Sequence, residues 1–126
     1  MKKVYYAHTK YIYGTPTERA ELKHIRRRFP QLRIVNPARY EGDPEKLRDT
    51  MGFCLRLVER CDAVIFSRLR GRVTAGVGKE VNHALSLGKP VLELSNGRFK
   101  RRRTPVKYLS VRETLNLWSK SHSALS

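Results

Sequence analysis

The side chain with the clearest capacity for chemistry is Glu80, which follows two glycines, Gly76 and Gly78. Apolar residues at helical spacing across residues 77–88 predict a helix that packs on a sheet, and this assignment puts Glu80 in the first helical turn. The positive end of the helix macrodipole favours an ionised carboxylate there. Glycines in a turn before the helix let a ligand approach the backbone closely. Glu80 is therefore a candidate nucleophile, with Gly76 and Gly78 as candidate binding positions.

The rest of the chain supplies the framework that must position this carboxylate. Strands are predicted at residues 4–7, 32–35, 63–66 and 91–94, with a short fifth strand at 106–109. Helices are predicted over residues 16–29, 44–58, 77–88 and 111–118. Strands that alternate with helices over short connections predict one α/β domain spanning residues 1–126. Its expected form is a doubly wound parallel sheet of about five strands with helices on both faces, as in Rossmann-like and flavodoxin-like folds.

Positive charge is the most unusual bulk property of the sequence. The 126 residues have a formal net charge of +16, which predicts attraction to phosphates on nucleotides, nucleic acids or other anionic surfaces. Arginines concentrate at residues 26–28 and in a basic loop expected over residues 97–105. The run 98–103 has three possible roles: a solvated loop, a nucleic-acid contact, or a gate over an anionic substrate. The scarcity of interleaved aromatic residues favours the solvated loop. Residues 119–126 are expected to be a frayed tail.

Several classes of site are excluded because required residues are missing. A phosphate-binding P-loop needs glycine where Val73 stands and Ser or Thr where Glu80 stands, and no closely spaced glycines follow the first strand. Cys54 and Cys61 form neither a disulfide framework nor a zinc pattern, so we expect buried thiols. No cluster has metal-ligand spacing, and neither a metal nor a cofactor is expected. Lacking signal-peptide and membrane-spanning features, the chain is expected to be soluble and cytoplasmic.

The stretch Gly76-Val77-Gly78-Lys79-Glu80-Val81-Asn82-His83-Ala84, followed by Gly88-Lys89-Pro90, resembles the signature of the nucleoside 2-deoxyribosyltransferase superfamily, which includes the 5′-nucleotide N-glycosidases. The similarity extends in order over residues 3–95. It implies a doubly wound sheet, and it implies that Glu80 attacks the anomeric carbon of a sugar to form a glycosyl-enzyme ester. It also implies a homodimer in which neighbouring subunits complete the pocket.

The resemblance assigns roles to two further positions. Thr74 stands where the N-glycosidase branch has a hydroxyl group that contacts the 5′-phosphate of the substrate. The basic loop before Thr74 also favours a phosphorylated substrate, and its cations are Arg68, Arg70 and Arg72. The superfamily commonly has a second acid that helps to protonate the leaving base, and Asp49 is the residue assigned to it here, with Asp43 as the other available carboxylate.

The segment after the first strand matches the base-and-sugar pocket of the superfamily by position. Tyr11 and Tyr13 are candidates to stack on a nucleobase, although half-buried packing is equally compatible with their spacing. His8 and Asn36, which follow the first two strands, are further binding candidates, and a structural hydrogen bond is the competing role for His8. Asn82 departs from the glycine that is common in the superfamily, and its amide could crowd the pocket.

These observations favour an enzyme that cleaves or exchanges the N-glycosidic bond of a (deoxy)nucleoside or its 5′-monophosphate, with Glu80 as nucleophile. A non-catalytic nucleotide or nucleic-acid binding module is the alternative, using the same crevice and the basic loops. A third hypothesis is an interaction protein whose tail recruits a partner. Glu80 itself has two structural alternatives, a helix-terminal charge without chemistry and a surface ion pair.

Overall fold

The structure is a computed structural model that describes residues 1–123, with side chains described through residue 120. Five strands form one sheet: β1 (Lys3–Ala7), β2 (Arg33–Val35), β3 (Ala63–Phe66), β4 (Val91–Ser95) and β5 (Arg98–Arg102). Their order is β2-β1-β3-β4-β5, in which β1 to β4 are parallel and β5 is antiparallel to β4. This is the strand order of flavodoxin-like folds with the last strand reversed, so the α/β prediction is confirmed.

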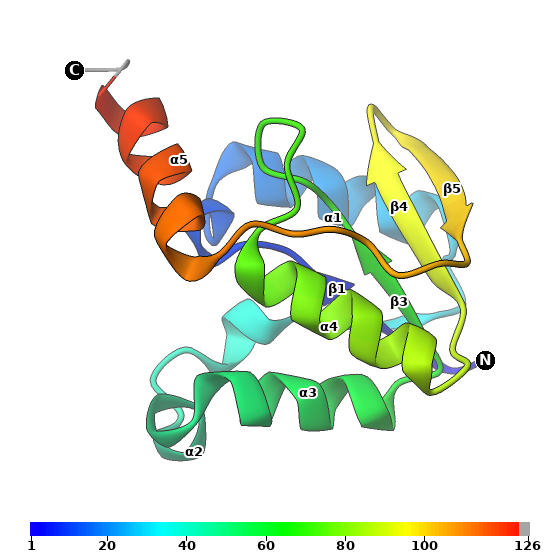
Figure 1. Cartoon of the computed structure of the whole chain (residues 1–126). Helices are drawn as coiled ribbons and strands as arrows, with labels where there is room; N and C mark the ends of the chain where they lie inside the picture. Colours follow the sequence, from blue (N-terminus) through cyan, green and yellow to red (C-terminus); the bar gives the residue numbers. More distant parts are fainter. Residues whose placement is uncertain (124–126) are drawn as a thin grey trace.

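The helices cover both faces of the sheet (Figure 1). The main ones are α1 (Pro16–Arg28), α3 (Thr50–Arg60), α4 (Ala75–Ser86) and α5 (Val111–Ser123), with shorter pieces η1 (Lys10–Ile12), η2 (Pro37–Tyr40) and α2 (Pro44–Arg48). Alternate residues of β1 point to opposite faces: Val4 and Tyr6 pack with Ile25 of α1, whereas Tyr5 packs with α3 and α4. Among residues 1–123, no helix combines the length and apolar character needed to cross a membrane.

The expected fifth strand at residues 106–109 is wrong, and so is the loop expected for the arginine run. The run forms β5, which pairs with β4 from Ser95 opposite Arg98 to Val91 opposite Arg102. Asn96 and Gly97 connect these strands with φ angles of 51° and 75°. An Asn-Gly pair with two positive φ angles makes the tight turn that suits a two-residue hairpin, so the sequence did contain this signal.

Residues 103–110, here called the strap, are held by α4 instead of by the sheet. The Asn82 amide donates to the Val106 carbonyl at 3.0 Å, and the Val106 amide donates to Asn82 Oδ1 at 2.8 Å. The Leu109 amide donates to the Val73 carbonyl at 2.9 Å. Figure 1 shows the strap crossing over α4 on its way to α5. The Asn82 side chain therefore points toward the strap, and its amide group, which could have crowded the expected pocket, is bonded to Val106.

The helix expected over residues 44–58 is divided into α2 and α3 at Asp49. The Asp49 backbone leaves the helical region, with φ −149° and ψ 80°, and its carboxylate accepts the Gly52 amide at 3.0 Å. Aspartate at this position caps α3 and satisfies an amide that otherwise has no partner. Because of the break, Leu47 is 73% exposed and does not belong to the expected buried stripe.

The ends of α4 and α5 also differ from expectation. α4 begins at Ala75, so Gly76 and Gly78 lie inside the helix and do not form a turn before it. Glu80 consequently occupies the second turn, where the macrodipole has less influence than was expected. α5 continues to Ser123, and the frayed tail expected from residue 119 is wrong up to that point. Residues 124–126 of that expected tail lie outside the described residues.

Replacing Gly78 with alanine tests the contact between α4 and the strap. A Cβ atom at Gly78 would lie 2.2–2.4 Å from Tyr108 Cγ, Cβ and Cδ1. We expect Gly78→Ala to lower the free energy of unfolding by about 1–3 kcal/mol, because the overpacked strap must shift. The measurement is urea unfolding followed by circular dichroism.

Gly76→Ala is the matched control, since a Cβ atom there would be 3.5 Å from Met51 Cε, an ordinary contact. Alanine in place of a helix-interior glycine should leave stability unchanged or raise it by up to about 1 kcal/mol. Equal destabilisation by the two substitutions would contradict the packing role of Gly78.

Candidate functional site

Glu80 lies in a buried polar cluster between α4, β1 and α3. Only 5% of the residue is exposed, and the Tyr5 hydroxyl of β1 donates to Glu80 Oε2 at 2.5 Å. The Cys54 thiol of α3 is also beside the carboxyl group. Burial raises the pKa of Glu80 to about 7, against the opposing effects of Tyr5, Cys54 and the positive charge of Lys46. The carboxyl group therefore exchanges its proton near neutral pH and is not held as a permanent anion.

Tyr13 and Lys46 complete the cluster. Burial, followed by the charge of Glu80, raises the pKa of the half-buried Tyr13 well above its usual range, so its hydroxyl remains protonated. Lys46 is buried, and its ammonium group donates to the Pro37 carbonyl at 2.9 Å and to the exposed Glu41 carboxylate at 2.6 Å. The same Nζ atom lies 5.4 Å from the centre of the Tyr13 ring. These contacts place a lysine and a tyrosine near one enclosed carboxyl group.

The cluster lies in the core on one face of the sheet, near the position that is usual for a ligand site. β1 and β3 are neighbours in the sheet, yet the chain leaves them toward opposite faces, to α1 and to α4. Such a divergence is the topological switch point of a doubly wound sheet, where a crevice opens beyond the strand ends. Tyr13 belongs to the segment after β1, and Glu80 belongs to the helix after β3.

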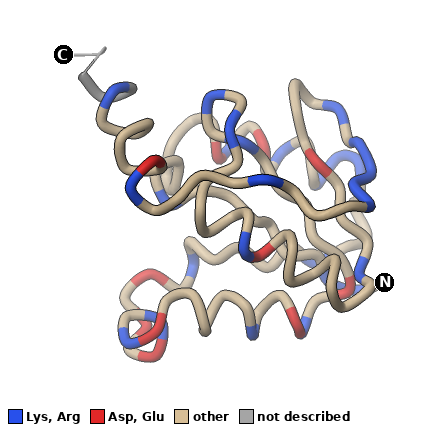
Figure 2. The backbone as a smooth tube through the Cα atoms, in the orientation of Figure 1, with Lys and Arg blue, Asp and Glu red and all other residues tan. Residues whose placement is uncertain are grey.

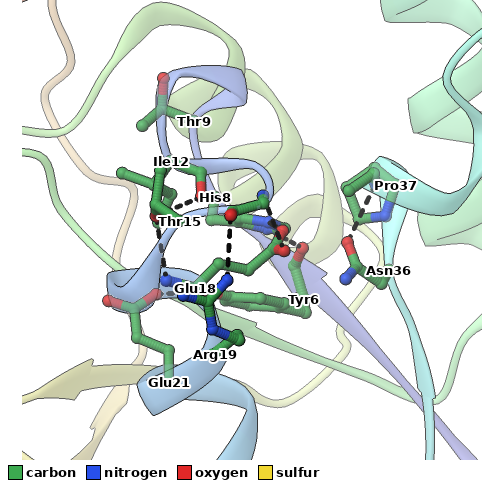
Figure 3. A network of polar contacts seen from close by, with 12 residues as sticks. Tyr6, His8, Thr9, Ile12, Thr15, Glu18, Arg19, Glu21, Asn36 and Pro37 are labelled. Carbon is green, nitrogen blue, oxygen red and sulfur yellow. Dashed lines mark hydrogen bonds and ion pairs between the residues drawn. The ribbon is translucent and has the colours of Figure 1, made fainter.

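His8 takes part in a separate network that fixes the segment after β1 (Figure 3). Its Nδ1 lies 2.9 Å from the Tyr6 carbonyl, its Nε2 lies 2.7 Å from Glu18, and its ring stacks on Tyr6 at 3.6 Å. Glu18 also accepts the Gly14 amide at 3.0 Å. Burial lowers the pKa of His8 despite the adjacent Glu18 carboxylate. These contacts assign His8 the structural role that was the alternative to binding.

Tyr11 and Asn36 also have partners that account for their positions. The Tyr11 ring stacks on Trp118 of α5, with centroids 4.7 Å apart and planes inclined by 10°. Asn36 accepts the Ala38 amide at 2.9 Å and caps η2. It lines a cleft of about 600 Å³ between α1 and β2. Glu80 does not line this cleft, so the structure does not bring Asn36 to the carboxyl group.

The remaining predicted residues lie in separate surroundings. Thr74 is buried at the N-cap position, but its side chain makes no capping hydrogen bond. Arg68 reaches away to Glu93, with Nε and Nη2 at 2.9 and 3.2 Å from its oxygens. Asp49, the assigned general acid, is exposed and caps α3. Gly78 packs under Tyr108, whereas Gly76 contacts Met51.

Of the predicted site residues, Tyr13 is one whose pKa is raised by the charge of Glu80, after the larger effect of burial. Sequence reasoning missed Tyr5, Cys54 and Lys46. Tyr5 carried a usable signal, because a tyrosine in a buried strand requires a partner for its hydroxyl group. Lys46 carried none, since a lysine in a short helix is ordinarily exposed. Cys54 was expected to be buried, and it is.

The cluster is enclosed in this structure. Five surface clefts have volumes of about 400 to 720 Å³, and none of these five is lined by Glu80. Within the described residues, no group of three or more His, Cys, Asp or Glu side chains is arranged to hold a metal ion. What the cluster offers chemically is a carboxyl group that exchanges its proton near pH 7 in apolar surroundings, with a tyrosine hydroxyl fixing one oxygen.

Fold and cluster together define a doubly wound α/β protein with an ionisable carboxyl group enclosed at the switch point of its sheet. No protein-family model matches the sequence, and no curated protein matches it significantly. The superfamily resemblance therefore stays a prediction that rests on the motif around Glu80.

The raised pKa of Glu80 predicts a pH-dependent stability. With a folded pKa of about 7 against an ordinary value of 4.5, the folded state retains a proton that the unfolded state has lost between these values. This contribution to stability is complete below about pH 4.5 and disappears as the pH rises through about 7. Glu80→Gln removes the titration, so we expect its free energy of unfolding relative to the wild type to increase by about 2–3 kcal/mol between pH 5 and pH 8.

Urea unfolding of both proteins at the two pH values measures this difference. Glu45→Gln serves as the control, because Glu45 is an exposed carboxylate in α2 and its removal changes net charge by the same amount. The difference between Glu45→Gln and the wild type should change by less than about 0.5 kcal/mol. A Glu80→Gln difference that is equally constant would show that the carboxyl group does not titrate as assigned.

Proposed function

We propose that this protein cleaves or transfers the N-glycosidic bond of a (deoxy)nucleoside or nucleoside 5′-monophosphate, with Glu80 as the nucleophile. The observation that best supports the proposal is the buried Glu80 carboxyl group, bound by the Tyr5 hydroxyl and having a pKa raised to about 7. The strands β1 and β3, between which the switch point lies, precede Tyr13 and Glu80 in the chain, and the switch point is the usual ligand position in this architecture. The sequence motif around Glu80 is the second, independent support.

The proposed reaction uses the ionised form of Glu80. One carboxylate oxygen attacks C1′ of the sugar while the other keeps its hydrogen bond from Tyr5. The C1′–N bond breaks, its electron pair leaves with the base, and the base takes up a proton. The resulting glycosyl ester then reacts with water, giving hydrolysis, or with a second base, giving transfer. A low-polarity environment strengthens the interaction between the carboxylate and the positive charge that develops on the sugar.

Access to Glu80 requires movement, because the residue is almost fully covered. Tyr13 is the predicted base-contacting residue in its vicinity, and it lies next to Gly14, whose φ of 73° favours glycine. Binding of the sugar and base in place of the present neighbours therefore needs a displacement of the segment that carries Tyr13. Such adjustments between free and ligand-bound states are common around enclosed active sites.

A phosphorylated substrate is favoured by the loop that precedes α4. Arg70 and Arg72 are exposed, and neither forms an ion pair within 4 Å among the described side chains, although the charge of Arg72 acts on Glu113 of α5. Thr74 follows them at the start of α4, where backbone amide groups and the helix dipole favour an anion. The substrate class that best fits these residues is a nucleoside 5′-monophosphate.

The alternative is a non-catalytic nucleotide or nucleic-acid binding module that uses the same crevice and the basic loops. It is supported by the enclosure of Glu80, since a buried Tyr–Glu hydrogen bond also occurs in protein cores. Under that alternative the Tyr5–Glu80 pair only joins β1 to α4, and no nucleoside loses its base. Screening nucleosides and nucleoside 5′-monophosphates for free base by liquid chromatography separates the two functions.

Two substitutions test the proposed roles of Glu80 and Tyr5 in the same screen. Glu80→Gln should lower base release by at least about 10³-fold, because the amide is a poor nucleophile. The Tyr5 hydrogen bond lowers the pKa of Glu80, so Tyr5→Phe should raise that pKa. In the wild type, kcat/KM should rise with pH through about 7, and in Tyr5→Phe this rise should move to higher pH.

Tyr6→Phe is the matched control for Tyr5→Phe. Tyr6 is the adjacent buried tyrosine, but its hydroxyl binds Glu21 of α1 at 2.5 Å on the other face of the sheet. Its removal should leave the pH at which kcat/KM rises unchanged. The proposal is wrong if Glu80→Gln releases free base as fast as the wild type. It is also wrong if the pH at which kcat/KM rises moves equally in Tyr5→Phe and Tyr6→Phe.

A further inference from the structure

A concentrated positive surface lies where β5 meets the C-terminal end of α1. Figure 2 shows Lys and Arg along the β5 side of the molecule. Two segments about seventy positions apart in the chain contribute to it, because Phe99 of β5 packs edge-to-face on Phe29 at the end of α1. We call this surface the basic edge, and its cations are Arg27, Arg28, Arg98, Lys100, Arg101 and Arg103.

The charges of the basic edge are not neutralised by the protein. Glu93 of β4 is the carboxylate beside β5, and it is buried and already bound by Arg68 at 2.9 Å and Arg102 at 2.7 Å. None of the six cations of the basic edge has a carboxylate partner among the described side chains. Six unpaired cations at this density repel one another, so a polyanion that approaches them is strongly attracted.

The strand geometry distributes these cations on two faces. Phe99 packs toward α1, so Arg101, two residues later, lies on the same face. Lys100, opposite Glu93 in the register, lies on the other face. Arg98, at the start of β5, and the α1 residues Arg27 and Arg28 all line a cleft of about 640 Å³. β5 is the outermost strand, so the cations flank a free edge on both sides.

We propose that the basic edge binds duplex nucleic acid through its phosphate backbone. A duplex presents two rows of phosphates on either side of a groove, and a strand edge with cations on both faces matches that arrangement. Arginine predominates, and its planar guanidinium group binds phosphate oxygens through two hydrogen bonds. Phe99, the apolar residue of β5, is half-buried, so β5 offers no exposed apolar anchor of the kind that membrane-bound surfaces use.

This surface is separate from the Glu80 cluster and does not depend on the proposed catalytic function. None of its six cations lies within the contacts of Glu80, Tyr5, Cys54, Tyr13 and Lys46. A competing role is purely protective, because charged side chains on an edge strand prevent pairing with another sheet. The two roles differ in what removal of the charges does.

Fluorescence anisotropy with a labelled DNA duplex of about 20 base pairs and mixed sequence tests the proposal on the full chain. If about six phosphates are contacted, the logarithm of the binding constant should fall with the logarithm of salt concentration with a slope of about −5. Affinity should then drop by about 10³-fold between about 50 and 200 mM salt. A single strand of the same sequence should bind more weakly.

Charge removal at the basic edge should lower affinity beyond its effect on net charge. The triple variant Arg98→Gln, Lys100→Gln and Arg101→Gln should reduce binding by about 10²-fold near 100 mM salt and reduce the slope by about three. The matched control removes the same charge from exposed arginines of α2 and α3: Arg48→Gln, Arg56→Gln and Arg60→Gln. The control should keep the slope and lose less than about threefold in affinity.

A second variant, Arg27→Glu, protects the test against failure of the triple variant to fold, because Arg27 is an exposed position of α1. It should also weaken binding, whereas Glu80→Gln should bind the duplex normally. Equal losses in the triple variant and its control would overturn the proposal, as would tighter binding of the single strand. Binding to phosphatidylserine vesicles but not to DNA would assign the surface to a membrane, and aggregation of the triple variant without loss of DNA binding would assign it to edge protection.

Discussion

The structure depends most on the burial of one carboxyl group against one hydroxyl group. The Tyr5–Glu80 hydrogen bond joins the interior strand β1 to helix α4, and it does so inside the larger of the two apolar clusters. Removing a carboxylate from water is costly, and a neutral or strongly hydrogen-bonded form reduces that cost. A fold selected for stability alone would be expected to place an apolar side chain here. Retaining a titratable group at the switch point is therefore the feature that most favours a chemical role.

The sequence was sufficient for the framework of this fold because its local signals agree with one another. Thr15 before Pro16 and Asp43 before Pro44 each predicted a helix start that the structure contains. The errors have local causes. The apolar periodicity predicted one continuous helix over residues 44–58, but the structure has a break at Asp49. A side chain that caps a new helix competes with continuation of the preceding one. The Asn96–Gly97 turn brings the arginine run back alongside β4, where it pairs as strand β5. The geometry of the turn sets this pairing irrespective of the charge of the run.

The site was less predictable than the fold, because it depends on which buried side chains meet across the core. Glu80 was identified from its motif. Its place in the second turn was not predicted, because this depends on where α4 begins, and its raised pKa was not predicted, because this depends on the groups that surround it. Lys46 reaches the cluster through a short helix that no periodic pattern marks. His8 shows the reverse case. Its side chain looked available in the sequence, yet Tyr6 and Glu18 occupy both ring nitrogens.

The strap follows α4 in the sequence by more than a strand, so α4 is synthesised before the segment that covers it. Strands β1 to β4 and helix α4 are complete by residue 95, whereas the segment that covers Gly78 and pairs with Asn82 lies at residues 103–110. The outer surface of α4 therefore has no cover from the strap until the last quarter of the polypeptide has been made. The Asn82 amide then offers the arriving chain a donor and an acceptor together, as a neighbouring strand does. The contact that covers this surface thus depends on one side chain of α4 and not on a further strand of the sheet.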